Sequence, residues 1–340
     1  MNILVCNAQV PFIRGGAELQ AEGLVDALRQ AGHRAELVAL PFKWYPKAEI
    51  FKSALAWRLL HLTQSNGMRI DRIITSKFPS YAAQHPHKIV WLVHQLRQAY
   101  DWYGTPQSDW TMQDRAVREQ LFELDRRTLG EAVKRFTTSC NLADRLRKFN
   151  GLDAEVLNAP PRLAGQFRAG PYGDSILYLG RLDPSKRIDL FLHALARVKN
   201  ARAIIAGTGN EADALQRLAY SLNIRDRVEF TGYVDDARVI ELYANARAVF
   251  YAPVDEDYGY ATIEAFMSAR PVITTNDAGG VLEFVEDKIN GLVAAPAPEA
   301  IADALSYVWS NPDQCRVWGE TGRERVRDIT WANVVERLTA

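Results

Sequence analysis

The chain has 340 residues, of which 48% are hydrophobic and 24% are charged, a composition typical of a soluble globular protein. This length exceeds what one ordinary core requires and favours two domains. Lys plus Arg and Asp plus Glu both number 41, so the net charge gives no argument for a nucleic-acid partner. The sequence contains no run of 18 apolar residues, which excludes a membrane-spanning helix of ordinary length.

The balanced net charge conceals a difference between the two halves. Residues 1–165 contain 22 Lys and Arg against 16 Asp and Glu, a surplus of +6, whereas residues 166–340 contain 19 against 25, a surplus of −6. The first half also contains a basic and aromatic stretch made of Lys43, Trp44, Lys47, Lys52, Trp57 and Arg58. This stretch indicates either docking on an anionic membrane or a core helix with solvated cations.

The three cysteines, Cys6, Cys140 and Cys315, lie far apart and form no CxxC pair. Such spacing indicates free thiols in a reducing compartment and neither a zinc site nor a disulfide framework. Residues 2–7 already have the pattern of a buried strand, and no basic leader precedes them, so we expect no signal peptide. The expected location is cytoplasmic, with peripheral contact at the inner face of the membrane as an open addition.

The first half alternates short aliphatic runs with helical periodicity. A predicted strand at 3–6 is followed by a Gly-containing loop and by a helix with Ala21, Leu24 and Leu28 on one stripe. Further strands are predicted at 35–40, 72–75, 88–93, 135–138 and 154–157, and the longest helix at 114–129. Repeated alternation of this kind implies a parallel sheet covered by helices on both faces.

Residues 164–174 interrupt this pattern with three glycines and a proline, and we place an interdomain linker there. The alternation then restarts, with strands predicted at 175–179, 203–206, 228–230, 248–251, 271–274 and 291–294. We therefore predict Rossmann-like, doubly wound domains over 1–165 and 166–327, and a terminal helix over 328–340. Two such domains that face each other place ligands in the crevice at the carboxyl ends of both sheets.

The stretch 255–285 carries the clearest chemical pattern. Glu256 and Glu264 lie eight positions apart, the first in a loop and the second inside the predicted helix that follows. Tyr258 and Gly259 provide a tight turn, so the first helical turn presents bare backbone N–H groups that stabilise an anion. Carboxylates beside such a turn accept hydrogen bonds from sugar hydroxyls. The alternative is a solvated acidic loop before an ordinary helix.

This stretch resembles the signature of retaining glycosyltransferase family 4, which has the GT-B fold. The match consists of a Glu, seven residues, a second Glu, Pro-Val, and a Gly-Gly loop followed by Glu, represented here by Glu256, Glu264, Pro271, Val272, Gly279, Gly280 and Glu283. The resemblance implies that Glu256 contacts the transferred sugar and that Glu264 holds the nucleotide ribose. It also implies that Gly279 and Gly280 lie beside the sugar and phosphates.

A second constellation, at 178–190, places Arg181 and Lys186 after a predicted strand and before a helix. Two fixed cations there can neutralise a departing diphosphate, and in the resembled family this pattern carries the diphosphate-binding pair. The family often has Gly after the Lys, where this chain has Arg187. We assign no role to Arg187 from the sequence and expect its replacement by Ala to be mild.

The first half contributes Gly15 and Gly16, which follow the first predicted strand and lack the GxGxxG spacing of dinucleotide-binding proteins. By the resemblance, this loop closes over the donor, and His94, at the end of the strand 88–93, faces the reacting sugar. Gly207 resembles a nucleotide-side loop residue. The resemblance covers the whole chain, and residues 329–338 resemble the terminal helix that crosses back to the first domain.

The same residues also allow other chemistries. Asp255, Glu256 and Asp257 also spell a DxD metal motif, but that motif belongs to a single-domain fold and would be expected earlier in the chain. No metal or other cofactor is therefore expected. A sugar-nucleotide epimerase or hydrolase on the same scaffold, and a non-catalytic binding protein, remain the rival functions.

The sequence thus predicts a retaining, metal-independent hexosyltransferase that uses a nucleotide-diphosphate sugar as co-substrate. Its expected partners are this donor and a carbohydrate or lipid-linked acceptor, in polysaccharide or glycolipid assembly. The motifs do not determine the base, the sugar, the acceptor or the oligomeric state.

Overall fold

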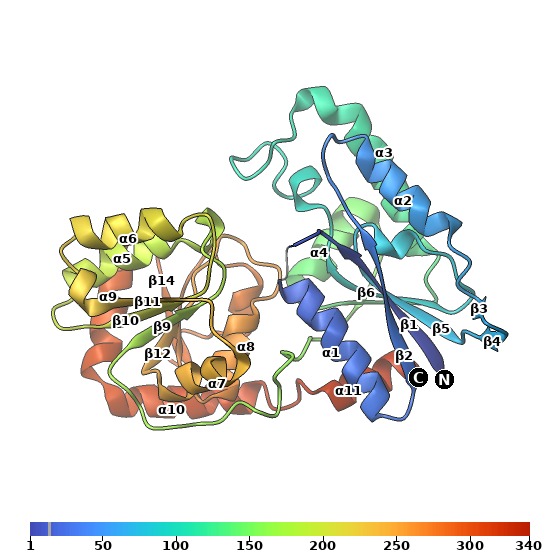
Figure 1. Ribbon diagram of the computed structural model, residues 1–340. Helices are drawn as coiled ribbons and strands as arrows, with labels where there is room; N and C mark the ends of the chain where they lie inside the picture. The colour runs from blue at the N-terminus through green and yellow to red at the C-terminus, as the bar shows by residue number, and fades with distance from the viewer. Residues whose placement is uncertain (13–14) are drawn as a thin grey trace. The chain divides into compact units, whose positions relative to one another are not determined.

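The computed structural model describes residues 1–12 and 15–340 (Figure 1). By its internal contacts the chain divides into two compact units. The first unit comprises Met1–Arg162 together with Ile329–Ala340, and the second comprises Leu163–Asp328. Within the described residues, each unit is built on a six-stranded parallel sheet. The predicted α/β class with two parallel sheets is confirmed.

The sheet of the first unit has the strand order β2-β1-β5-β6-β7-β8. Its strands are β1 (Asn2–Gln9), β2 (Arg34–Pro41), β5 (Arg72–Lys77), β6 (Lys88–His94), β7 (Lys134–Thr137) and β8 (Glu155–Val156). A separate antiparallel hairpin joins β3 (Gln64–Ser65) to β4 (Met68–Arg69). The central strand β6 is largely apolar, and all residues of β5 after Arg72 are buried, because helices cover both faces of the sheet.

One face of this sheet is covered by α1 (Gly16–Gln30) and α11 (Trp331–Thr339). On that face the indoles of Trp91 and Trp331 meet edge to face at 6.3 Å. The other face is covered by α2 (Glu49–Leu59), α3 (Arg115–Gly130) and α4 (Cys140–Asn150) (Figure 1). The last helix of the chain therefore belongs to the core of the first unit.

The sheet of the second unit has the order β11-β10-β9-β12-β13-β14. Its strands are β9 (Ile176–Leu179), β10 (Ala203–Ala206), β11 (Val228–Gly232), β12 (Ala248–Phe250), β13 (Val272–Thr275) and β14 (Gly291–Ala294). Counted along the chain within this unit, the order is the 3-2-1-4-5-6 of the doubly wound Rossmann sheet. The order reverses between β9 and β12, which is where such sheets bind ligands.

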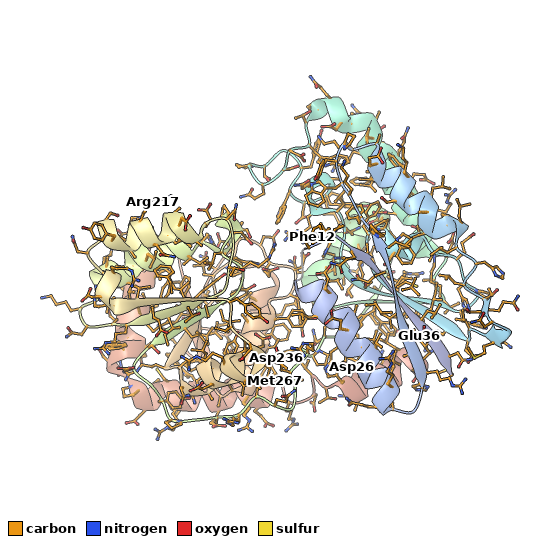
Figure 2. All side chains as sticks on the ribbon, in the orientation of Figure 1. Phe12, Asp26, Glu36, Arg217, Asp236 and Met267 are labelled. Atoms are coloured by element: carbon orange, nitrogen blue, oxygen red, sulfur yellow. The ribbon has the colours of Figure 1, made fainter. Side chains whose placement is uncertain are left out.

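Helices cover both faces of the second sheet (Figure 1). One face carries α5 (Ile188–Arg197), α6 (Ala212–Ser221) and α9 (Pro298–Ser310), and the other carries α7 (Asp236–Asn245), α8 (Tyr260–Met267) and α10 (Pro312–Arg325). Their polar sides face solvent, as with Arg217 on α6 (Figure 2), while Leu215 and Ala219 of that helix are buried. None of the helices described is both long enough and apolar enough to cross a bilayer.

Candidate functional site

The loops that follow β12 and β13 pair with each other beyond the ends of the strands. The Asp255 amide donates to the Asp277 carbonyl at 2.9 Å, and the Glu256 amide donates to Ala278 at 3.1 Å. In return, the Gly280 amide donates to the Glu256 carbonyl at 2.7 Å. Glu256 and Gly279 thus form an isolated parallel bridge, which fixes the position of Glu256 at the carboxyl edge of the sheet.

Gly279 and Gly280 are required by this close approach of two backbones. Gly279 has φ +65°, and a Cβ there would lie 2.6 Å from the Glu256 carbonyl oxygen. A Cβ at Gly280 would overlap the carbonyl oxygen of Asp257. The Gly-Gly pair therefore has a structural reason that the motif alone does not express, and its predicted place beside the donor phosphates stays a prediction.

Lys186 and Glu256 form an ion pair at this edge. Lys186 ends the short 3-10 helix η4 (Pro184–Lys186), which follows β9, and its ammonium contacts the Glu256 carboxylate. The Tyr251 hydroxyl donates to the same carboxylate at 2.9 Å. Burial alone would lower the pKa of Lys186, but the Glu256 carboxylate outweighs it and holds that pKa above its usual value. Lys186 is therefore a fixed cation beside a fixed anion.

Tyr251 is a member of this cluster that the sequence interpretation missed. It falls at the end of the strand predicted at 248–251, and no role is assigned to it from the sequence. The available signal was its position directly before the loop that carries Glu256. A hydroxyl that emerges at the carboxyl end of a central strand can reach a site at that edge.

Arg181 is not a member of this cluster. Its side chain is 63% exposed, and its guanidinium lies 3.5 Å from the Asp183 carboxylate. Its backbone carbonyl accepts a hydrogen bond from the Tyr178 hydroxyl at 2.7 Å. The two cations predicted to act together thus have different surroundings, because Lys186 is held by the protein and Arg181 extends into solvent.

Glu264 lies in α8 and accepts a hydrogen bond from the Tyr243 hydroxyl at 2.8 Å. Burial raises the pKa of this carboxyl to about 7, and the bond from Tyr243 opposes that rise only in part. Gly259, with φ +88°, is the N-cap of α8. The Tyr258 ring is buried and packs edge to face on Tyr260 and Phe284, which gives this side chain a packing role.

Gly207 follows β10, where its loop packs against the loop after β9. Its φ is +132°, and a Cβ there would overlap the carbonyl oxygen of Gly180. The Leu182 amide donates to the Thr208 carbonyl at 2.9 Å. Glycine is therefore needed here so that two loops of the carboxyl edge can touch.

The predicted residues of the first unit lie at the carboxyl ends of β1 and β6. Gly15 is the N-cap of α1, and its amide donates to the Glu18 carboxylate at 2.9 Å. Glu18 also forms a buried ion pair with Lys77 at the end of β5. Sequence reasoning missed Lys77. His94 ends β6, with its Nδ1 at 3.0 Å from the Gln95 carbonyl oxygen.

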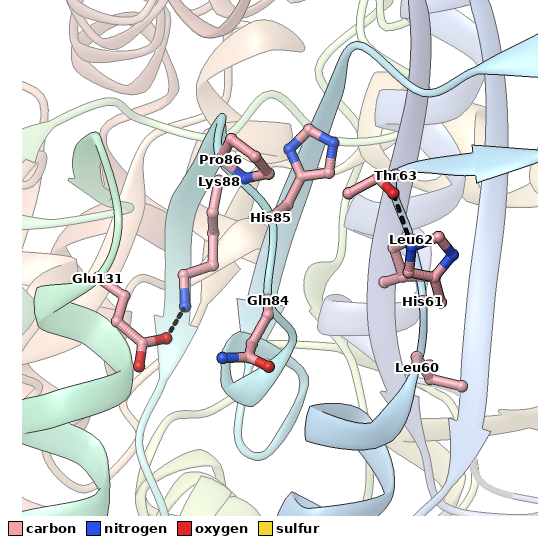
Figure 3. Close-up of a pocket in the computed structure, with 9 residues that line it drawn as sticks. All are labelled: Leu60, His61, Leu62, Thr63, Gln84, His85, Pro86, Lys88 and Glu131. Atoms are coloured by element: carbon pink, nitrogen blue, oxygen red, sulfur yellow. Dashed lines mark hydrogen bonds and ion pairs between the residues drawn. The ribbon is translucent and has the colours of Figure 1, made fainter.

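A cavity of about 430 Å³ in the first unit lies elsewhere (Figure 3). It opens near the amino end of β6, and it is lined by Leu60, His61, Leu62, Thr63, Gln84, His85, Pro86, Lys88 and Glu131. Several of the polar groups in it already have protein partners. Lys88 donates to three carbonyls and to Glu131, and both nitrogens of His85 contact backbone groups. This cavity therefore presents little unsatisfied chemistry to a ligand.

Among residues 1–12 and 15–340, no cluster of three or more His, Cys, Asp or Glu side chains is arranged to hold a metal ion. Asp255, Glu256 and Asp257, which spell the DxD pattern, lie in the loop whose backbone pairs with residues 277–280.

Part of the second unit matches a known protein family. Residues 171–325 match the glycosyl transferases group 1. The chain is 30% identical over 240 residues to D-inositol 3-phosphate glycosyltransferase of Mycolicibacterium smegmatis, covering 66% of this chain and 55% of that protein. It is 33% identical over 140 residues to an uncharacterized glycosyltransferase of Methanocaldococcus jannaschii, covering 40% and 36%. The chain thus matches about half or less of the length of these two relatives.

Solved structures resemble the chain along its whole length. Sucrose-phosphate synthase from Thermosynechococcus elongatus has a TM-score of 0.80 at 18% identity, over 99% of this chain and 97% of that chain. Anabaena HepE in complex with UDP-glucose has a TM-score of 0.74 at 15% identity, over 99% and 98%. At sequence identities this low, the similarity supports a shared fold and nothing further. Residues 171–325 of the chain thus match the glycosyl transferases group 1, and the chain has the GT-B fold.

Proposed function

We propose that this chain is a glycosyltransferase that moves a hexose-type sugar from a nucleotide-diphosphate donor to an acceptor hydroxyl. The observation that supports it is the ion pair of Lys186 and Glu256 at the carboxyl edge of the family-matching unit, with Glu264 on the helix that follows. A cation for the diphosphate and carboxylates for sugar and ribose hydroxyls are the groups that such a donor needs.

The proposed reaction proceeds with retained anomeric configuration, as in family 4. The acceptor hydroxyl attacks the anomeric carbon on the face that the nucleotide leaves, through an oxocarbenium-like transition state, and the leaving phosphate oxygen takes its proton. Lys186 and Arg181 stabilise the charge that develops on the diphosphate. Glu256 positions the transferred sugar and Glu264 the ribose.

The remaining predicted residues surround the same donor in this proposal. Gly207, Gly279 and Gly280 let the backbone approach the nucleotide and phosphates. Gly15 and Gly16, at the start of α1, cover the donor, and His94 faces the reacting sugar. A polysaccharide or glycolipid precursor is the proposed acceptor, in keeping with relatives named for transfer to inositol phosphate and phosphatidyl-inositol.

The donor is identified by thermal shift with UDP, GDP, ADP and their glucose or mannose conjugates. A ligand that binds only the folded state raises stability by RT ln(1 + [L]/Kd). HepE was solved with UDP and with UDP-glucose, so UDP-glucose is the first probe. Transfer that requires an added acceptor supports the proposal, whereas donor loss without acceptor indicates a hydrolase, and no shift with any probe contradicts it.

We also propose that the reaction needs no metal ion, since in this proposal Lys186 and Arg181 supply the positive charge that a metal ion would otherwise bring to the diphosphate. Activity is expected to persist in excess EDTA. Loss of activity in EDTA with rescue by Mn²⁺ or Mg²⁺ would instead assign a metal role to the stretch 255–257.

Contact with an anionic membrane stays a proposal, and the structure leaves fewer basic and aromatic side chains available for it than the sequence suggests. Trp57 is buried, Lys47 is paired with Asp114, and Arg58 is paired with Glu131. The face left for lipid is the exposed side of α2, with Lys52, Leu55 and Leu59. Flotation with anionic and neutral liposomes at low salt tests it, and equal binding to both contradicts it.

A further inference from the structure

The side chain of Arg187, to which no role is assigned from the sequence, makes several hydrogen bonds. Its guanidinium donates to the Ala252 carbonyl at 2.8 Å and to the Pro253 carbonyl at 2.7 Å, both in the loop after β12. It also donates to the Thr275 hydroxyl at 2.8 Å and, through two nitrogens, to the Asp277 carboxylate at 2.8 Å. The side chain is 12% exposed. One guanidinium therefore joins the ends of two neighbouring strands.

The backbone of Arg187 is in an unusual conformation for this residue type. Its φ is +52° and its ψ is 42°, in the left-handed region, between η4 and α5. That region disfavours any residue with a Cβ and is readily occupied by glycine, and the resembled family often has Gly here. A strained residue persists where its surroundings hold it. Here the hydrogen bonds of the guanidinium stabilise the left-handed conformation of Arg187.

The two loops that Arg187 joins are the loops that carry the candidate site. Glu256 lies three residues beyond Pro253, and Gly279 and Gly280 lie just beyond Asp277. The Val254 amide donates to the Ser185 carbonyl at 2.8 Å, so the η4 segment is attached to the same loop. Lys186 is the residue before Arg187, and its ion pair with Glu256 depends on the relative position of η4 and the loop after β12.

We propose that Arg187 is a positioning residue that sets the place of Glu256 relative to Lys186 and of the Gly279-Gly280 loop. This rests on the proposed function for the roles of those residues, and it predicts a larger effect than the mild one expected from the sequence. A planar guanidinium can serve four acceptors in fixed directions, which a lysine ammonium cannot reproduce. Small displacements at a reacting centre reduce the rate more than they weaken binding.

The deciding variant is Arg187→Gly, because glycine removes the guanidinium and also relieves the left-handed backbone. This protein is expected to fold, and its kcat is expected to fall about tenfold or more, with a smaller change in KM for the donor. Arg187→Lys is expected to lie between the wild type and Arg187→Gly. Arg197, at the other end of α5, forms an exposed ion pair with Glu299 of α9. Arg197→Ala is the matched control and should retain the wild-type kcat.

Hydrogen exchange gives a second reading that needs no donor. In Arg187→Gly the amides of Asp255, Glu256 and Gly280 should exchange faster, while the amides of β10 keep their protection. The kinetic assay uses UDP-glucose, GDP-mannose and ADP-glucose. If the wild type turns over none of them, the proposed function fails, and hydrogen exchange still decides the positioning role. A lower melting temperature with unchanged kcat and unchanged exchange in these loops would reduce Arg187 to a stabilising residue and overturn the inference.

Discussion

Glu264 is a single residue whose environment makes the stability of the protein depend on pH. Its folded-state pKa of about 7 lies above the ordinary value of 4.5, because burial disfavours the carboxylate. The folded state therefore binds the proton more tightly than the unfolded state. The resulting stabilisation is complete below pH 4.5 and is lost as pH rises through about 7.

We predict that Glu264→Gln, which keeps an acceptor for the Tyr243 hydroxyl, loses less stability than the wild type between pH 5 and pH 8. Urea unfolding of both proteins at the two pH values measures this. The buried Asp125, whose pKa burial also raises to about 7, contributes equally to both proteins and cancels in the comparison. Parallel pH dependence of the two proteins would show that Glu264 is not the responsible group.

Lys186 is predicted to act on the leaving group. Negative charge concentrates on the diphosphate as the glycosidic bond breaks, so a preorganised cation lowers the barrier. Lys186→Ala should reduce kcat about 10²–10³-fold, and Glu256→Ala should fail similarly, whereas Glu264→Ala should mainly raise KM for the donor. Steady-state kinetics measures both parameters.

Arg181→Ala tests whether the exposed guanidinium turns toward the donor. A loss as large as that of Lys186→Ala is expected if it does, because the two cations then share the diphosphate. Arg202→Ala, which removes an exposed cation 3.5 Å from Asp174, is the control and should remain within a few fold of the wild type. If Arg181→Ala is as mild as this control, Lys186 acts without it.

Some members of the candidate site are recognisable in the sequence, and others become visible only in the structure. Glu256, Glu264 and Lys186 are recognisable because their spacing within a short segment carries the pattern. Arg187 is not, because its role arises from partners on other loops, and Tyr251 is not, because a tyrosine at the end of a strand forms no recognisable pattern with Glu256 five positions later. Arg187 meets Thr275 and Asp277, which lie 88 and 90 positions away, and no local pattern encodes such a contact.

At the level of elements, the pairing of the loops after β12 and β13 predicts that two glycines differ in how much their substitution by Ala destabilises the protein. Gly279 and Gly232 have nearly equal φ values, +65° and +68°. A Cβ at Gly279 meets Glu256 and Asp255, whereas a Cβ at Gly232 meets nothing within 4 Å. Both substitutions by Ala carry the left-handed cost of about 1–2 kcal/mol, and only one adds a backbone collision.

We therefore expect Gly279→Ala to destabilise the protein more than Gly232→Ala and to reduce activity, because the collision displaces Glu256. Chemical denaturation compares the two free energies of unfolding, and the donor assay compares the rates. Equal stability and equal activity of the two variants would mean that the loops after β12 and β13 can move apart without a loss of free energy.

Buried elements were easier to predict from the sequence than exposed ones. The strands β10 and β14 are short apolar runs bounded by loops, so the predicted 203–206 and 291–294 agree with them in their bounds. The hairpin of β3 and β4 was missed because its strands have two residues each and are exposed. Helix α2 was hard to place because its apolar residues form no clean stripe, with Leu55 and Leu59 exposed.

At the scale of the whole molecule, the last helix contributes to the first unit through Trp331. Its indole N–H donates to the Pro161 carbonyl at 3.1 Å, and its ring packs on Trp91 and against Gly23, whose Cβ would lie 2.5 Å from it. Trp331→Ala should cost about 3 kcal/mol, as for other large packed side chains. Calorimetry should show a lower melting temperature.

Glu336→Ala on the exposed side of the same helix is the control and should leave the melting temperature unchanged. Gly23→Ala should resemble Trp331→Ala, because an added methyl group at that position displaces the indole. Wild-type melting temperatures for both Gly23→Ala and Trp331→Ala would show that α11 is not needed by the first unit.

The fold class could be predicted because strand and helix alternate twice along the chain, and parallel sheets follow from that alternation. The order of the strands within each sheet was not encoded in any local pattern. The order depends on how the crossover connections place strands that are distant in the sequence, as with β9 between β10 and β12. Long-range contacts determine this placement.

The membership of α11 in the first unit also affects how the protein is made. The second unit is one continuous segment, Leu163–Asp328, while the first is interrupted by it and resumes only at Ile329. A ribosome releases the chain from the amino end, and domains fold as their segments emerge. The second unit is thus fully synthesised before the segment that covers Gly23 and Trp91 exists. Until then the nascent first unit exposes that apolar face, which is where a cotranslational chaperone is expected to bind.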